Sequence, residues 1–560
     1  MTGLVTVLGS GAMSNGIASI AEADVIFVIG SNTTETHPVI GLRMLQAAKD
    51  HGADIIVADP RRIKLADKAR LWLCQKPGTD AALVNALCHV IVRDDLADRD
   101  FISSRTENFE TFAEAVAECT PEWAEKITGV PAADIEEAAK IYGSAERAAI
   151  FYTMGITQHT SGTDNVKSLA NLALLTGNLG KPGTGLNPLR GQNNVQGASD
   201  MGCAPVFFPG YQRVDDDAAR KRFEELWGGK LPGKPGLTAT EMSQAMIDGT
   251  IEAMWIMGEN PVMSDPNLSH ARKAFSSVKF LVVQDIFLTE TAELADVVLP
   301  AAAYAEKEGT FTNTERRVQR VRQAVLPPQG ACDDLSIVQA IAERLDPEKG
   351  VAFQDDFRPG GDRMDPAKAQ AVFDEIASVW PAIAGINYER LETGGIQWPC
   401  PDKDHPGTPV LFENGFPRGR GSFTPVVWRN PEELPDAEYP FILSTGRVLY
   451  QYHTGTMTRR SQVLEDADRG PVIEMNPADA ARLQIIEGEE VDVASRRGTI
   501  TLPVLVTERI RPGVTFIPFH YKEAAANLLT NDALDPVSKI PEAKVCAVNV
   551  TKKSSGTRAA

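Results

Sequence analysis

The chain has 560 residues, of which 43% are hydrophobic and 23% are charged, and its formal net charge at pH 7 is −19. This length is too great for a single hydrophobic core and predicts roughly three or four packing units. The acidic balance argues against a general binder of nucleic acids or anionic membranes, although a local basic pocket could still hold an anionic ligand. No apolar run approaches the ~20 residues that span a bilayer, and the start of the chain lacks the basic and apolar regions of a signal peptide.

The seven cysteines are dispersed along the chain, and no two of them have the CxxC or CxxxC spacing of an iron–sulfur or structural zinc site. We therefore predict that this chain supplies no metal ligands. Isolated cysteines in a long acidic chain are typical of reduced thiols that fill the core of a cytoplasmic protein.

The first part of the chain alternates predicted strands and helices. An uninterrupted apolar run predicts a buried strand at 25–29, Gly30-Ser31-Asn32 then turns into a helix, and a second strand is predicted at 55–58. This unit is typical of a doubly wound parallel sheet, to which a strand at 148–152 and a helix at 166–176 would also belong.

A second α/β segment follows a stretch rich in glycine and proline. Its strands are predicted at 253–257, 280–284 and 297–299. Asp333 is predicted to cap a helix, and the apolar face of that helix would consist of Ile337, Val338, Ile341 and Leu345.

The sequence pattern of the remaining part of the chain changes twice. Residues 355–435 show little periodicity and predict an irregular connection. Short β-rich runs separated by turns then predict a C-terminal β-barrel, with strands at 441–444, 490–494, 499–506 and 515–519. The polar tail after Lys552 is expected to be disordered.

Two features of the first α/β unit are compatible with a nucleotide. Backbone N–H groups of Gly30-Ser31-Asn32, at the carboxyl end of a strand, can bind phosphate oxygens. Asp59 ends the next strand, where a carboxylate can accept hydrogen bonds from ribose hydroxyls, and Arg61 and Arg62 follow it. Because the GxGxxG fingerprint is missing, an ordinary βαβ unit explains these residues equally well.

The stretch 183–197 is the most unusual in the chain. Glycines and amide side chains dominate it, and Arg190 is its only charge. A guanidinium group can hold a small carboxylate through two parallel hydrogen bonds. The density of amides favours a ligand-binding loop over a polar surface turn in which Arg190 forms a salt bridge.

Residues 183–202 (GTGLNPLRGQNNVQGASDMG) resemble the active-site loop of formate dehydrogenase catalytic subunits, in the molybdopterin (DMSO reductase) superfamily. The resemblance covers essentially the whole chain. Its further motifs are GSGAMSN at 9–15, DPR at 59–61, MGITQ at 154–158, LLTGNLG at 174–180, MGENP at 257–261, QD at 284–285, ADVVLP at 295–300, HTGTMT at 453–458 and the stretch 519–527. Many members of the superfamily share these general elements, whereas RGQNNVQG at 190–197 is typical of formate dehydrogenases.

The resemblance implies two doubly wound α/β domains around a cofactor cleft and a C-terminal β-barrel of the molybdopterin dinucleotide-binding type. The implied divisions are 1–192 for the α/β domain that binds the first dinucleotide, 193–302 for the second α/β domain, 303–435 for an irregular or helical connecting region, 436–552 for the barrel and 553–560 for the tail.

The family also implies that two pterin guanine dinucleotides hold one molybdenum or tungsten ion. The positions that match its first-dinucleotide set are Gly30, Asn32, Glu35, Thr36, Asp59, Arg61, Gly78 and Asp80, with Met154, Gly155 and Gln158 nearby. The positions that match its second-dinucleotide set are Gly258, Asn260, Ser264, Gln284, Asp285 and Asp334. The barrel positions that would close over the pterins are Arg447, Leu449, His453, Phe519, Asn527 and Lys544. Ordinary alternatives exist for some of them, since Asp285 could cap a strand end, His453 could be a satisfied polar residue and Lys544 could be a solvated charge.

The implied reaction is the two-electron oxidation of formate to carbon dioxide, or its reverse. Arg190 would orient formate, Gln192 would lie beside it, and electrons would leave through an Fe4S4 cluster to electron-transfer subunits that are iron–sulfur or NAD-reducing. Two other classes stay open: another molybdopterin oxidoreductase such as a nitrate reductase, and a non-catalytic pterin-binding homologue. Arg190 within its amide-rich loop favours a carboxylate substrate.

The chain departs from the family at its beginning. The full subunit starts with a cysteine-rich Fe4S4 segment, followed by a Cys-His or selenocysteine-His pair that ligates the metal. Gly3-Leu4 match the residues just after that pair, so we expect the cluster segment and the pair to lie upstream of Met1 and the isolated chain to be inactive. Our hypothesis is that a selenocysteine codon was read as a stop; a trimmed chain, a frameshift and a subunit split in two are the rival explanations.

Overall fold

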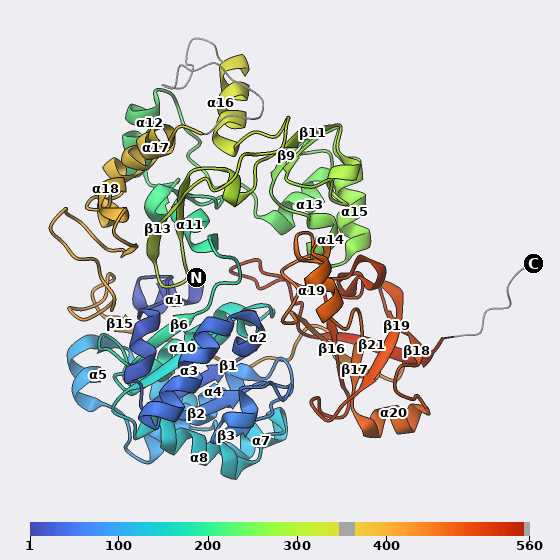
Figure 1. Ribbon diagram of the computed structural model, residues 1–560. Helices are drawn as coiled ribbons and strands as arrows, with labels where there is room; N and C mark the ends of the chain where they lie inside the picture. Colours follow the sequence, from blue (N-terminus) through green and yellow to red (C-terminus); the bar gives the residue numbers. More distant parts are fainter. Residues whose placement is uncertain (346–363, 554–560) are drawn as a thin grey trace, which may run out of the picture. The chain divides into compact units, whose positions relative to one another are not determined.

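The computed structural model describes residues 1–345 and 364–553 (Figure 1). Contacts between residues divide the chain into two compact units. The first comprises Met1–Gly191, Met263–Ser269 and Val410–Ala560, and the second comprises Gln192–Val262 and His270–Pro409, each as far as it is described. Among the described residues, no helix is long and apolar enough to cross a membrane.

The first unit is built around a parallel sheet of five strands in the order β3-β2-β1-β5-β6. The strands are β1 (Val25–Ile29), β2 (Asp54–Ala58), β3 (Leu71–Leu73), β5 (Ala148–Tyr152) and β6 (Gly185–Pro188). Every residue of β1 is buried, as expected for a central strand whose two faces are both covered.

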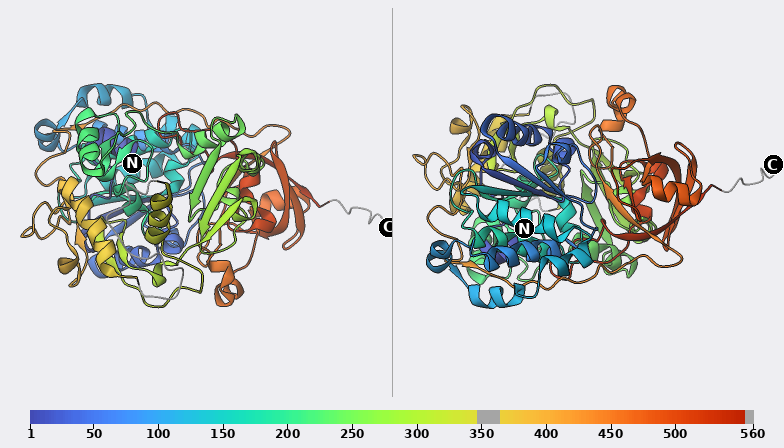
Figure 2. Two further views of the ribbon diagram at one scale, coloured as in Figure 1. Left: turned by 90° about the horizontal axis from the view of Figure 1, so that it is seen from above. Right: turned by 90° about the horizontal axis from the view of Figure 1, so that it is seen from below.

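Helices cover both faces of this sheet (Figure 2). Phe27 of β1 and Ile56 of β2 enter a core formed with α1 (Thr2–Leu8), α4 (Asp80–Arg93), α8 (Ala132–Gly143) and α10 (Gly162–Leu175). Ile26 and Val57 point to the opposite face and pack with α3 (Pro38–His51). Successive residues of each strand therefore supply two different cores, which confirms the predicted doubly wound arrangement.

The helix predicted after Gly30-Ser31-Asn32 is divided in two, which corrects the sequence-based expectation. The short α2 (Thr33–Thr36) ends at His37, and α3 begins at Pro38. The proline ring disfavours a helical backbone in the residue before it, and His37 has φ −140°. The other elements of the first sheet region are α5 (Arg99–Arg105), α6 (Phe109–Val116), α7 (Pro121–Thr128), α9 (Met154–Thr157), and the paired β4 (Thr106–Glu107) and β15 (Gly421–Ser422).

The second unit contains a three-stranded parallel sheet in the order β11-β10-β9. Its strands are β9 (Ala253–Met257), β10 (Phe280–Asp285) and β11 (Val297–Pro300), at the predicted positions. Ile256, Leu281 and Val283 pack on one face with residues of α13 (Ala239–Ile247) and α15 (Leu268–Ser277). The remaining elements are α11 (Val195–Asp200), α12 (Asp217–Trp227), α14 (Pro261–Ser264, of which Met263 and Ser264 belong to the first unit), α16 (Asp334–Leu345), α17 (Pro366–Val379), α18 (Tyr388–Leu391), β7 (Phe207–Phe208), β8 (Gln212–Arg213), β12 (Gly309–Thr312), β13 (Arg317–Val321) and β14 (Ile396–Gln397).

Two expectations about this unit are corrected. Asp333 does cap α16, but the predicted apolar face is incomplete, because Val338 is 39% exposed and Leu345 is 81% exposed while Ile337 is buried. The region 355–435 is not wholly irregular, since α17 occupies 366–379. Asp365 accepts a hydrogen bond from the backbone N–H of Ala367 and Pro366 takes the first helical position, so the start signal was present in the sequence. Residues 355–363 of the predicted connection lie outside the described residues.

The C-terminal part of the first unit closes into a barrel in the order β16-β20-β17-β19-β18-β21. Its strands are β16 (Phe441–Gly446), β17 (Ile473–Met475), β18 (Glu490–Ser495), β19 (Gly498–Val506), β20 (Val514–Pro518) and β21 (Cys546–Lys552), with α19 (Gln462–Ala467) and α20 (Pro477–Leu483) in the connections. The predicted barrel is confirmed. The sequence reading missed β17, which is short, and β21, whose apolar residues were not assigned to a strand. The tail residues 554–560 lie outside the described residues.

Candidate functional site

The strand order of the first sheet reverses between β1 and β5. After β1 the chain passes through α3 to β2 on one side, and after β5 it passes through α10 to β6 on the other. The two connections diverge from the carboxyl ends of adjacent parallel strands, and such a switch point leaves a crevice that binds ligands in doubly wound sheets. The segments that follow these two strands are Gly30–Thr36 and Thr153–Gln158, which contain seven of the predicted site residues.

Gly30 and Gly155 face each other across this switch point. The backbone N–H of Gly155 donates to the carbonyl of Gly30 at 3.1 Å, and Oγ1 of Thr153 donates to the same oxygen at 2.7 Å. A Cβ on Gly155 would lie 2.5 Å from that carbonyl oxygen, and a Cβ on Gly30 would lie 2.8 Å from the carbonyl carbon of Gly155. Gly30 also has φ +56°. Only glycine at both positions allows the two backbones to approach this closely.

The amide of Asn32 is an unsatisfied polar group within the crevice segment. Both its Oδ1 and its Nδ2 are buried, and neither has a hydrogen-bond partner among the described residues. A buried amide without partners is costly and is rare in folded proteins. A polar ligand at the carboxyl end of β1 would supply both partners.

Asp59 and Arg61 follow β2 at the same edge of the sheet, and both side chains are buried. Oδ1 of Asp59 accepts the backbone N–H of Arg61 at 2.9 Å. The guanidinium of Arg61 is held by two hydrogen bonds to Glu474 of β17, at 2.6 and 3.1 Å, and lies 3.5 Å from the ring centroid of Phe516. Burial acts to lower the pKa of Arg61, but the adjacent Glu474 outweighs it and raises the pKa. Arg61 therefore joins the sheet to the barrel, and Asp59 is the group whose second carboxylate oxygen is available to a ligand.

Burial shifts several ionisable groups here towards their neutral forms. It raises the pKa of Asp59 and of Asp80 to about 6 each, despite hydrogen bonds from Arg61 and Gln75, and it lowers the pKa of Lys544 to about 8. The charges of Asp59 and Lys544 influence each other, and Nζ of Lys544 donates to the carbonyl of Thr445 at 2.6 Å. Lys544 is therefore not the solvated charge that the sequence left open.

His159, which the sequence reading did not select, lies beside Asp80. Its Nε2 donates to the carbonyl of Gly155 at 2.8 Å and is 3.8 Å from Oδ2 of Asp80. Burial lowers the pKa of this histidine, and its Nδ1 is buried without a partner among the described residues. No sequence pattern distinguishes His159 from an ordinary core histidine; its position after the Met154–Gln158 motif was the only available signal.

Arg190 follows the edge strand β6, at the same carboxyl edge. The backbone N–H of Leu189 donates to the carbonyl of Tyr152, and Nη2 of Arg190 donates to the carbonyl of Gly11 at 3.2 Å. The α-amino group of Met1 is near; burial, together with the charge of Arg190, lowers its pKa to about 5. We expected residues 183–197 to be one polar loop, but Gly185–Pro188 form the buried β6 and α11 begins at Val195. The Ser14–Asn15 segment pairs with the edge of β6, since Oγ of Ser14 accepts the N–H of Leu186, and this pairing explains why a polar stretch forms a strand.

Barrel loops bring together three of the predicted residues. Nε of Arg447 is buried without a partner among the described residues, and its guanidinium lies 4.9 Å from the ring centroid of Tyr452. The rings of His453 and Phe519 are 6.1 Å apart, edge to face. His520, which sequence reasoning missed, links these loops: its Nε2 accepts the N–H of Val448 and its Nδ1 donates to the carbonyl of His453. Burial lowers the pKa of His520 to about 4, so the neutral ring that this pattern requires is the stable form.

The other predicted residues of the first unit occupy separate positions. Asn527 donates to the carbonyls of Met263 and Ser264 at 3.0 and 3.1 Å, so Ser264 belongs to this unit. Gly78 has φ +80°, and a Cβ there would lie 2.4 Å from Cγ of Pro431. The placements of the others are as follows: Glu35 is buried 3.7 Å from Nη2 of Arg509, Oγ1 of Thr36 is 3.1 Å from the carbonyl of Asn32, Met154 is 47% exposed, and Gln158 and Leu449 are half-buried.

Five predicted residues cluster near the carboxyl edge of the second unit's sheet. The N–H of Gly258 donates to the carbonyl of Gln284, and Nε2 of Gln284 donates to Asp334 at 2.6 Å. Oε1 of Gln284 is buried without a partner among the described residues. Asn260 is held by Thr291 and Glu290, and Asp285 accepts the backbone N–H groups of Ile286 and Phe287, as a strand-end cap does. Gln192, which was predicted to lie beside the substrate, is the first residue of the second unit, whereas Arg190 belongs to the first unit.

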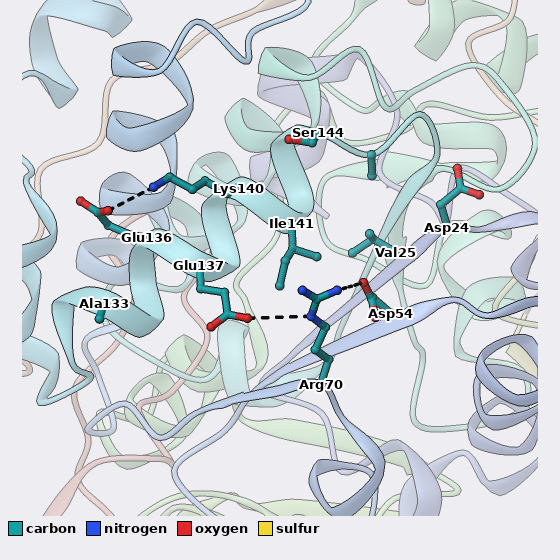
Figure 3. Close-up of a pocket in the computed structure, with 11 residues that line it drawn as sticks. Asp24, Val25, Asp54, Arg70, Ala133, Glu136, Glu137, Lys140, Ile141 and Ser144 are labelled. Carbon is teal, nitrogen blue, oxygen red and sulfur yellow. Dashed lines mark hydrogen bonds and ion pairs between the residues drawn. The ribbon is translucent and has the colours of Figure 1, made fainter.

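A cavity of about 640 Å³ lies at the opposite edge of the first sheet (Figure 3). It is lined by Asp54 at the start of β2, by Arg70 before β3 and by the side of α8 that carries Glu136, Glu137 and Lys140. Arg70 pairs with Asp54 at 2.6 Å and Glu137 at 3.8 Å, and Lys140 pairs with Glu136 at 3.4 Å. These ion pairs lie at the amino ends of the strands, away from the switch point, and the carboxylates of the cavity lining outnumber its cations.

The chain that carries these amides, glycines and buried carboxylates is similar to known proteins. Residues 6–344 match the family Molybdopterin oxidoreductase, and residues 441–547 match the family Molydopterin dinucleotide binding domain. The chain belongs to the molybdopterin oxidoreductase family. This assignment confirms the predicted family and the predicted fold class.

The relatives place the chain more narrowly, among formate dehydrogenase alpha subunits. It is 53% identical over 557 residues to the F420-dependent formate dehydrogenase subunit alpha of Methanocaldococcus jannaschii, covering 99% of this chain and 80% of the relative. Identity to the F420-dependent formate dehydrogenase 1 subunit alpha of Methanococcus maripaludis is 47%, with coverages of 99% and 80%. Formate dehydrogenase H of Escherichia coli is 41% identical, with coverages of 98% and 76%.

The acetylene hydratase of Pelobacter acetylenicus is similar in fold. Its solved structure gives a TM-score of 0.76 at 21% identity and covers 98% of this chain and 80% of that one. At this identity the likeness concerns the fold alone.

The glycine pair generates a stability prediction. Gly155→Ala should destabilise the first unit by on the order of 3 kcal/mol, because the new Cβ must displace the backbone of Gly30 and break the strand-end contact. Gly229→Ala is the matched control, since a Cβ there meets no described atom within 4 Å. Urea unfolding of the three proteins measures the difference, and equal midpoints for wild type and Gly155→Ala would show that the two backbones are not in contact.

The buried carboxylate generates a pH prediction for the cofactor-free chain. The pKa of Asp59 in the folded protein, about 6, lies above its ordinary value of 3.8, so folding favours the protonated form. That stabilising contribution is complete below about pH 4 and is lost as the pH rises through about 6. Asp59→Asn should therefore be more stable than wild type at about pH 8, by on the order of 2 kcal/mol, and equally stable at about pH 4.

Urea unfolding of both proteins at the two pH values tests this expectation. Asp50→Asn, at an exposed position near the end of α3, is the control for a change of charge alone. A stability difference between wild type and Asp59→Asn that is the same at both pH values would contradict the raised pKa of the buried Asp59 carboxyl group.

Proposed function

We propose that this chain carries the formate site of a formate dehydrogenase and catalyses the two-electron oxidation of formate to carbon dioxide, or its reverse. The observation that supports the proposal most strongly is the placement of Arg190. It is a half-buried residue after β6, at the same carboxyl edge as the switch point between β1 and β5. The similarity to formate dehydrogenase alpha subunits supports the same substrate.

The proposed cofactor is a molybdenum or tungsten ion held by two pterin guanine dinucleotides. In this proposal the first dinucleotide is bound by the crevice residues Asn32, Asp59 and Asp80, and the second by Gly258, Asn260 and Gln284. The unpaired amide of Asn32 and the unpaired amide oxygen of Gln284 support the fit, because each is a buried polar group that a bound ligand would satisfy. When bound, the cofactor supplies the two-electron redox chemistry that protein side chains lack.

The residues of the chain have binding and orienting roles in this proposal. Asp59 accepts hydrogen bonds from ribose hydroxyls through the carboxylate oxygen that Arg61 leaves available. Arg190 binds the two oxygens of formate and fixes the direction of its C–H bond, and Gln192 lies beside the substrate. Arg447 and His453 contribute polar groups from the barrel loops that His520 holds together.

Electron-transfer subunits, iron–sulfur or NAD-reducing, remain the proposed partners, and the Fe4S4 cluster is proposed to belong to the complete subunit. We propose the cytoplasm as the compartment, because all seven cysteines are free thiols. The hypothesis that the isolated chain is inactive stays a prediction, which formate-dependent dye reduction by the purified chain tests.

Arg190→Lys in the cofactor-loaded enzyme is the decisive variant. A lysine keeps the positive charge but cannot form two parallel hydrogen bonds to a carboxylate, so we expect a higher KM for formate together with a lower kcat. The expected loss in kcat/KM is on the order of 100-fold, which corresponds to about 3 kcal/mol. Steady-state dye reduction with formate, and with nitrate as the electron acceptor in a parallel assay, measures it.

Arg99→Lys is the control, because this arginine lies at the surface on α5 and pairs with Asp95. It should leave the kinetics unchanged. Near-native kinetics in Arg190→Lys would remove the assigned role of Arg190, and nitrate reduction by a wild-type enzyme that does not oxidise formate would replace the proposed function with that of a nitrate reductase.

A further inference from the structure

His37 connects the crevice segment to the segment that carries Arg190. Its Nε2 lies 2.6 Å from the backbone carbonyl oxygen of Arg190, and its Nδ1 lies 2.8 Å from Oγ1 of Thr36. His37 and Arg190 are 153 positions apart in the sequence, and both belong to the first unit.

The chemistry of the two partners fixes the state of the imidazole. A carbonyl oxygen can only accept, so Nε2 must carry a hydrogen and donate it to Arg190. Burial lowers the pKa of His37, and the nearby charge of Arg447 lowers it further, so the ring is neutral and has a single N–H. Nδ1 is then an acceptor for the hydroxyl of Thr36, whose single hydrogen the carbonyl of Asn32, 3.1 Å away, can also accept. Both ring nitrogens are satisfied in one tautomer.

The backbone of His37 is itself rigid. The residue lies between α2 and α3 and precedes Pro38, whose ring restricts the conformation of His37. The α3 helix is anchored by Ile40 and Met44 in the core on that face of the sheet. The imidazole is therefore a fixed point that can hold a neighbouring segment.

Arg190 needs such a fixed point on its C-terminal side. Leu189 is anchored to Tyr152 of β5, but Gly191 is exposed, and a Cβ on it would meet no described atom within 4 Å. The bond from His37 restrains the main chain at the peptide between Arg190 and Gly191, whereas the bond from Nη2 to the carbonyl of Gly11 restrains the far end of the same side chain.

We propose that His37 is a positioning residue for formate, because its Nε2–H fixes the main chain of Arg190 and so directs the guanidinium towards the substrate. The same imidazole links the substrate-binding arginine to the Asn32–Thr36 segment of the crevice. The identity of the substrate in this inference rests on the proposed function, whereas the hydrogen bond between His37 and Arg190 does not depend on it.

Two amide substitutions separate the contact with Arg190 from the contact with Thr36. The Nε2 atom of a glutamine reaches the position of the imidazole Nε2, whereas the amide of an asparagine reaches only the position of Nδ1. In the cofactor-loaded enzyme, His37→Asn should lower kcat/KM for formate roughly tenfold, mainly through KM, and His37→Gln should remain within about threefold of wild type. His89→Asn is the control, since Nδ1 of His89 bonds the carbonyl of Val116 on α6, away from Arg190.

A second readout does not depend on turnover. Phenylglyoxal modifies arginine guanidinium groups, and peptide mass spectrometry follows the labelling of Arg190 with time. His37→Asn should increase the labelling rate of Arg190 several-fold and weaken the protection that added formate gives, whereas His37→Gln and His89→Asn should match wild type. Thermal unfolding and guanine-nucleotide content of each variant verify that the fold and the cofactor are retained.

The outcomes separate the two proposals. A wild-type enzyme that does not oxidise formate overturns the proposed function. Labelling of Arg190 still tests the contact between His37 and the main chain of Arg190 in that case. Wild-type KM and wild-type labelling in His37→Asn overturn the role of His37. Equal losses in His37→Asn and His37→Gln overturn it as well, because the loss would then not follow the donor to Arg190.

Discussion

The contact between Gly30 and Gly155 determines where the other groups of the first site lie. These glycines lie just after the two strands at which the sheet order reverses, and the missing side chains let the backbones meet at hydrogen-bonding distance. From this point one connection leads to Asn32 and His37, and the other leads to His159. Arg190 reaches the same edge because β6 pairs with β5. A side chain at either glycine would separate these segments and with them the groups that could bind one ligand.

Burial explains the electrostatics of the region better than net charge does. The chain as a whole is acidic, yet Arg61, Lys544 and Arg447 are gathered near this edge together with Asp59 and Asp80. Removed from water, the carboxyl groups hold their protons more tightly and the lysine holds its proton less tightly. A ligand that supplies hydrogen-bond donors to Asp59 would reverse part of this shift, so cofactor binding and protonation are expected to be linked.

Much of the fold was predictable from the sequence, because the central strands of the first sheet are uninterrupted apolar runs that are followed by turns. The run at 25–29 and the strand predicted at 148–152 both matched the structure, as did the alternating barrel strands. The errors have physical causes. Pro38 divides a helix that periodicity alone predicted to be continuous, and pairing with Ser14 makes part of a polar stretch the strand β6. The helix α17 was missed because its periodicity is weak, although Asp365 and Pro366 mark its start.

The candidate site was only partly accessible from sequence. Glycines, Asp59 and Arg190 occupy recognisable motifs, whereas His37, His159 and His520 each bond a backbone carbonyl, a contact that no local pattern reveals. Such contacts join segments distant in the chain and appear only once the fold is known.

The central claim is that the carboxyl edges of the two parallel sheets bind pterin guanine dinucleotides. The most direct measurement is the nucleotide content of the protein purified from a host that makes this cofactor, by acid hydrolysis and chromatography of the released nucleotides. The account predicts guanine nucleotide at about two per chain, as expected for a cofactor with two dinucleotides. A protein that retains no nucleotide, or that retains an adenine nucleotide instead, would contradict it.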